Sequence, residues 1–125
     1  MKASLNSLHH QATDWLRETE FYKQELAILQ TRLEEVAAKN TAQEVLAQVE
    51  HFQNKFILNR EQQDTLIHDL RKEASNLEEK IKGLLEHTNE KFTDVNEGMQ
   101  NRMKTFAAAF ADLRFEFNSF VSKVI

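Results

Sequence analysis

The amino-acid sequence predicts an all-α protein, an antiparallel up-down-up bundle of three long helices. Its 125 residues include two glycines and no proline, although these residues supply most tight turns and any sandwich, barrel or parallel α/β sheet needs many of them. Apolar residues also recur at alternating spacings of three and four, which is typical of one buried helix face. We treat residues 1–125 as one domain, because a chain of this length fits a single core.

The first helix is expected over residues 4–39. Lys39-Asn40 is a suitable end with Asn40 in a left-handed cap, and Thr41 to Glu44 has the T-x-x-E form of a capping box for the next helix. Thr19 is the one weak member of the apolar seam. The seam consists of Leu5, Leu8, Ala12, Trp15, Thr19, Tyr22, Leu26, Leu29, Leu33 and Val36.

The second helix is expected over residues 42–87, but six polar residues at 59–64 interrupt its apolar pattern. One interpretation is a continuous helix with Asn59 and Gln63 in the seam, and the other is a break that gives four helices. Continuity is favoured because Arg, Glu and Gln form helices well and the stretch holds no Gly, Pro or capping box. The apolar seam positions are Val45, Val49, Phe52, Phe56, Leu66, Leu70, Ala74, Leu77, Ile81 and Leu84.

The third helix is expected over residues 90–124, after a boundary near His87 with Thr88 or Asn89 as its cap. Short connections make neighbouring helices antiparallel. The middle helix is the longest, so we expect a kink, an overhang or a second subunit to accommodate its surplus length. The seam of the third helix consists of Phe92, Val95, Met99, Met103, Phe106, Phe110, Leu113, Phe117, Phe120 and Val124.

Phe115 does not belong to that inner seam. It lies on the opposite side of the helix in a row without charge, although 29% of the chain is charged. The row is either a lone exposed Phe beside small residues or a face covered by a neighbour, and we expect the neighbour, with Arg114 and Glu116 setting its orientation. The candidate interface consists of Ala108, Ala111, Phe115, Asn118 and Ser122, and Ile125 continues the row.

Three segments carry a resemblance to known proteins. They read FYK at 21–23, LEEVAAKNT at 33–41 and VEHFQNKF at 49–56. Together they resemble a group of small uncharacterised bacterial all-helical proteins of coiled-coil character. The resemblance implies a helical fold and attaches no activity, cofactor or ligand to the chain.

The histidines do not form a metal-binding motif. None of the five has Glu three residues before it, as the Glu-x-x-His motif of carboxylate-bridged di-metal bundles requires. The pairs His10/Asp14 and Asp64/His68 have i,i+4 spacing, but the seams place His10 and His68 on outward faces. With no Cys and no Gly-rich loop, we expect no metal, no cofactor and no enzymatic activity.

The charges favour neither nucleic acid nor a membrane as a partner. Residues 1–39 hold five basic and six acidic groups, 40–89 hold six and nine, and 90–125 hold five and five, so no segment is basic. The longest apolar run, residues 106–111, is far shorter than the roughly 18 residues of a spanning helix. The absence of Cys and of a signal sequence suits a soluble cytoplasmic protein.

These observations together predict a non-enzymatic helical-bundle protein that acts by protein–protein interaction or self-association. Its partner would be a second copy, giving a homo-oligomer, or an unknown protein. The alternative is a ligand- or metal-binding bundle with an undetected core site. Complete heptad seams favour the first function, because a pocket usually interrupts a seam with convergent polar groups.

Overall fold

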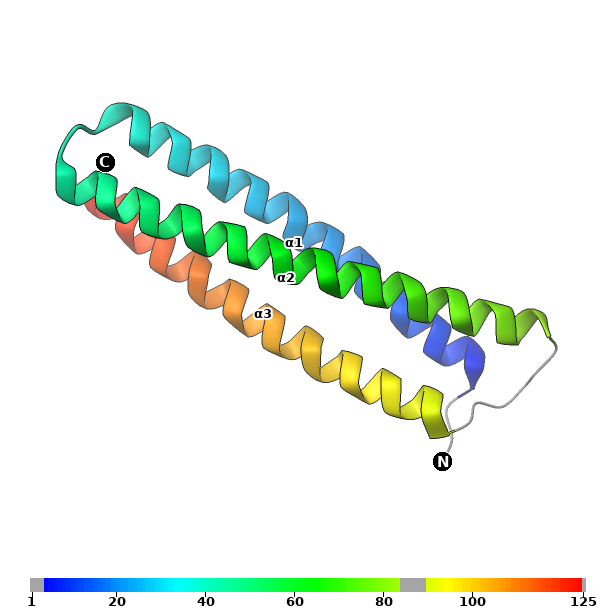
Figure 1. Cartoon of the computed structure of the whole chain (residues 1–125). Coiled ribbons are helices and arrows are strands. Elements are labelled where there is room, and N and C mark those ends of the chain that lie inside the picture. Colours follow the sequence, from blue (N-terminus) through cyan, green and yellow to red (C-terminus); the bar gives the residue numbers. More distant parts are fainter. Residues whose placement is uncertain (1–3, 84–89, 125) are drawn as a thin grey trace.

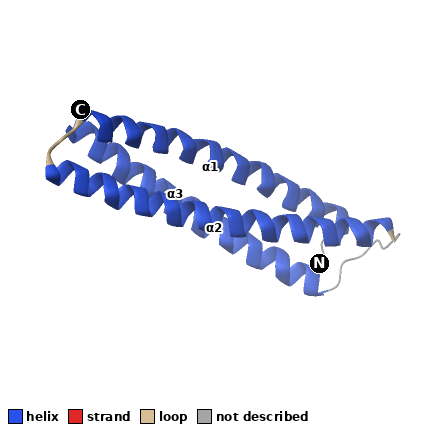
Figure 2. Ribbon diagram, turned by 45° about the horizontal axis from the view of Figure 1, so that its top comes forward, coloured by secondary structure: helices blue, strands red, loops and turns tan. Residues whose placement is uncertain are grey.

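The protein is a bundle of three long helices that lie side by side (Figure 1). The computed structural model describes residues 4–83 and 90–124, with α1 at Leu5–Lys39, α2 at Gln43–Lys82 and α3 at Glu90–Val124. The helices α1 and α3 run in the same direction and α2 runs against both (Figure 2). The predicted all-α three-helix bundle is confirmed. The four-helix alternative is wrong, because α2 continues without a break through residues 59–64.

The predicted seams form the core. Nine of the ten seam positions of α1 are buried, and Tyr22 is half-buried. In α2 the polar residues Asn59 and Gln63 are buried together with the apolar seam. Most of the buried side chains form one cluster along the bundle, and Leu5, Leu8 and Leu77 form a second, smaller one. Heptad spacing therefore gives the correct inward face of each helix.

The predicted caps between α1 and α2 are wrong in detail. Asn40 has extended backbone angles, φ −125° and ψ 137°, and it caps α1 through its side chain, whose Nδ2 donates to the Val36 carbonyl at 2.8 Å. The N-cap of α2 is Ala42, which makes no side-chain capping bond. Because α2 begins at Gln43, Thr41 lies one residue too early to cap it, and the capping box does not form.

The structure ends α2 at Lys82, where the Gly83 N–H donates to the Glu79 carbonyl at 3.1 Å. The predicted boundary near His87 and the candidate caps Thr88 and Asn89 lie outside the described residues. The helix α2 has 40 residues and its neighbours have 35 each. Its C-terminal end overhangs the starts of α1 and α3 in Figure 1, so an overhang accommodates the surplus length.

Candidate functional site

The exposed face of α3 carries the predicted candidate interface. All five of its residues are exposed, and Phe115 is 74% exposed, the highest value among the large apolar side chains of the described residues. Phe117, two positions further on, is fully buried against Phe52 and Phe56, with ring centroids 5.3 Å apart in each pair. We call Ala108, Ala111, Phe115, Asn118 and Ser122 the outer row.

The charged residues beside Phe115 already have partners within the bundle. The Glu116 carboxylate pairs with the Lys55 ammonium of α2 at 2.8 Å, and this hydrogen bond and charge lower the pKa of the Glu116 carboxyl. The Arg114 guanidinium lies 5.8 Å from the centre of the Phe110 ring. Both side chains contribute to contacts within the chain, and that they also orient a partner stays a prediction.

Aromatic contacts join α1 to the inner face of α3. The Tyr22 ring lies between the two helices, 5.4 Å from Phe106 and 5.1 Å from Phe110 between centroids, and Phe21 contacts it at 5.9 Å. Burial, together with the nearby Glu18, raises the pKa of the Tyr22 hydroxyl. Phe21 is itself 53% exposed. It is an exposed apolar residue of α1 outside the inner seam, and the heptad pattern does not single it out.

The other large exposed apolar residues, Ile28, Leu46, Ile57 and Leu58, lie on α1 and α2. Single apolar side chains on a protein surface are common and need no functional explanation. The outer row differs because Phe115 stands among four uncharged residues over about four turns of one helix.

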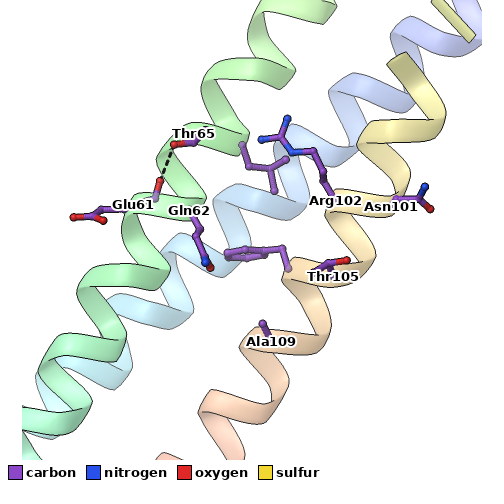
Figure 3. Close-up of a pocket in the computed structure, with 9 residues that line it drawn as sticks. Glu61, Gln62, Thr65, Asn101, Arg102, Thr105 and Ala109 are labelled. Atoms are coloured by element: carbon purple, nitrogen blue, oxygen red, sulfur yellow. Dashed lines mark hydrogen bonds between the residues drawn. The ribbon is translucent and has the colours of Figure 1, made fainter. Parts of the chain in front are cut away.

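A groove of about 540 Å³ separates α2 from α3 near the middle of the bundle (Figure 3). Apolar, polar and charged side chains line it: Glu61, Gln62, Thr65, Leu66, Asn101, Arg102, Thr105, Phe106 and Ala109. The Arg102 guanidinium donates to the Asp69 carboxylate at 2.9 Å, and this bond is the main cause of the lowered pKa of Asp69. The arginine charge is therefore paired within the fold, and the groove offers apolar surface with hydroxyl, amide and carboxylate groups at its edge.

The described residues hold no group of three or more His, Asp or Glu side chains arranged to bind a metal ion. His10 and His68 are exposed, as the seams predict, and the ring of His68 lies 3.3 Å from the carboxylate of Asp69. His87 lies outside the described residues. Over residues 4–83 and 90–124, no helix combines the length and the hydropathy that crossing a membrane requires.

Comparison of the chain with family models, with curated proteins and with solved structures gives no match. The resemblance to bacterial helical proteins therefore stays a prediction. The geometry of this chain alone carries the functional argument.

Proposed function

We propose that this chain is a non-enzymatic protein of the cytoplasm that acts by protein–protein association through the outer row of α3. Its partner is a second copy of the chain, giving a homo-oligomer, or another protein. One observation supports this best: Phe115 is 74% exposed within a row of uncharged residues. A bundle core does not need an aromatic side chain in that position.

The shape of the outer row suits contact with another helix. Ala108 and Ala111 have small side chains, and the distance between packed helices depends on the side chains at their contact. A second helix can therefore approach α3 closely at these positions. Phe115 then contributes most of the apolar area. Full burial of such a side chain is worth about 1.5–3 kcal/mol, and a symmetric pair would bury it twice.

Sedimentation velocity across a dilution series tests the proposal. We expect the wild type to associate as its concentration rises and Phe115→Glu to remain monomeric with unchanged helicity. Leu58→Glu is the matched control, because it places the same charge on another exposed apolar position, on α2, and should associate like the wild type. A wild type that is monomeric at every concentration would refute self-association.

The groove between α2 and α3 favours a second candidate function, the binding of a mainly apolar small molecule. Its volume of about 540 Å³ is typical of ligand sites, which are mostly apolar with a few polar groups. Nile red is a suitable probe. Ala109→Phe, in the groove wall, should abolish dye fluorescence enhancement, whereas Ala47→Phe at an exposed site on α2 should not. Equal enhancement in both variants would exclude this site.

A further inference from the structure

The buried polar side chains of the described residues are Thr19, Asn59 and Gln63. Thr19 and Gln63 are fully buried, and Asn59 is 5% exposed. Thr19 and Gln63 lie at about the same level of the bundle, and Asn59 lies one turn of α2 away. Leu5 of α1 and Leu77 of α2 belong to the same small cluster, and because the two helices are antiparallel, equal steps along α1 from Leu5 and back along α2 from Leu77 lead to Thr19 and Gln63.

The side-chain amides of this polar layer are poorly hydrogen-bonded. Among the described residues, the Asn59 Oδ1, the Gln63 Nε2 and the Gln63 Oε1 have no hydrogen-bond partner. The Thr19 hydroxyl donates to the Leu16 carbonyl at 2.8 Å, and its oxygen keeps capacity to accept a bond. Unpaired amide groups inside a core lower stability, so apolar residues at 59 and 63 would make a more stable seam.

We propose that Thr19, Asn59 and Gln63 form a layer that sets the axial register of α2 against α1. The rest of the two seams is apolar, and seams of this kind repeat every seven residues, so they match nearly as well after a slip of one heptad. In a slipped register, Gln63 would face the level of Ala12 or Leu26, and Thr19 the level of Phe56 or Leu70. After the slip, Gln63 would no longer lie at the level of the Thr19 oxygen, which can still accept a bond, and each polar side chain would lie in an otherwise apolar layer, so the slipped register is disfavoured.

The layer also fixes where α2 meets α3 along the bundle. The groove residues Gln62 and Leu66 are direct neighbours of Gln63 in α2, and two ion pairs, Lys55–Glu116 and Asp69–Arg102, join α2 to α3 on either side of this level. A slip of α2 would carry these contacts along the bundle. The single register thus holds the groove and the two ion pairs in place.

Distances between two spin labels measure the register directly, and the chain has no Cys to interfere with labelling. Labels on Gln24→Cys and Glu79→Cys occupy exposed positions of α1 and α2. In the wild-type background we expect one distance. In Asn59→Leu/Gln63→Leu we expect a second population displaced by about 10 Å, the rise of one heptad, and a roughly tenfold smaller unfolding constant because unpaired amides are removed.

A variant that moves the layer gives a sharper test. Exchanging each amide with the leucine seven positions later, as Asn59→Leu/Leu66→Asn with Gln63→Leu/Leu70→Gln, keeps the composition and should move the main distance by about 10 Å. One turn unwound beside the connection at residues 40–42 would provide the length that the slip requires. Gln53→Leu/Gln62→Leu changes two exposed amides of α2 and should keep the wild-type distance.

Three results would overturn the proposal. The first is a single unchanged distance in Asn59→Leu/Gln63→Leu, and the second is a wild-type distance in the exchanged variant. The third is loss of helicity in Asn59→Leu/Gln63→Leu, which would mean that the amides are required for folding itself rather than for the choice of register.

Discussion

Truncation of two neighbouring phenylalanines of α3 should have very different effects. Phe117 is fully buried and contacts the rings of Phe52, Phe56 and Phe120, so Phe117→Ala removes a large side chain and leaves a cavity. Such substitutions usually lower the free energy of unfolding by about 3–5 kcal/mol. Phe115 is 74% exposed, and an exposed substitution usually changes this free energy by at most about 0.5 kcal/mol.

Urea unfolding followed by circular dichroism measures both changes. It should be run at several protein concentrations, because association through Phe115 adds a contribution that grows with concentration. At the lowest concentration we expect Phe115→Ala to match the wild type and Phe117→Ala to unfold at a much lower urea concentration. A loss above about 1 kcal/mol for Phe115→Ala at that concentration, or below that for Phe117→Ala, would show that the assigned faces of α3 are wrong.

Three further substitutions test the charges and the backbone. Gly98 lies inside α3 with nothing within 4 Å of an added Cβ, so Gly98→Ala should raise the free energy of unfolding by about 0.5–1 kcal/mol in the same urea assay. Burial raises the pKa of the Glu73 carboxyl, so the charged carboxylate lowers the stability of the fold at neutral pH. Glu73→Gln should therefore melt at a higher temperature than the wild type at pH 7, and the difference should vanish at pH 3, where the carboxyl is protonated. Arg102 lowers the pKa of the Asp69 carboxyl. This pair should therefore stabilise the fold at neutral pH and lose its effect as the pH falls below the ordinary Asp pKa of 3.8. Asp69→Asn should melt at a lower temperature than the wild type at pH 7 but not at pH 2.

The sequence predicts the inward faces well, because burial follows the heptad phase of each helix. The same phase places Phe115 outside and Phe117 inside without knowledge of any neighbour. It also places Asn59 and Gln63 in the seam of α2, since helix-forming residues continue the helix through the polar stretch.

The heptad pattern within one helix does not predict which residues of different helices contact each other. The pairs Lys55–Glu116 and Asp69–Arg102 join residues far apart in the sequence, and so does the contact of Tyr22 with Phe110. The prediction of the α2 cap was wrong for a local reason. The helix begins one residue later than predicted, so Ala42 and not Thr41 is its N-cap. The groove depends on the spacing between α2 and α3, which no periodicity within one helix encodes.

Fluorine NMR of the protein made with fluorophenylalanine tests the proposed association most directly. Variants with Phe115→Leu and Phe117→Leu assign the two resonances. We predict that the Phe115 signal shifts steadily with rising protein concentration, as its 74% exposed ring becomes covered, while the Phe117 signal stays constant. A Phe115 signal that keeps the same shift from the lowest to the highest concentration would contradict association through the outer row.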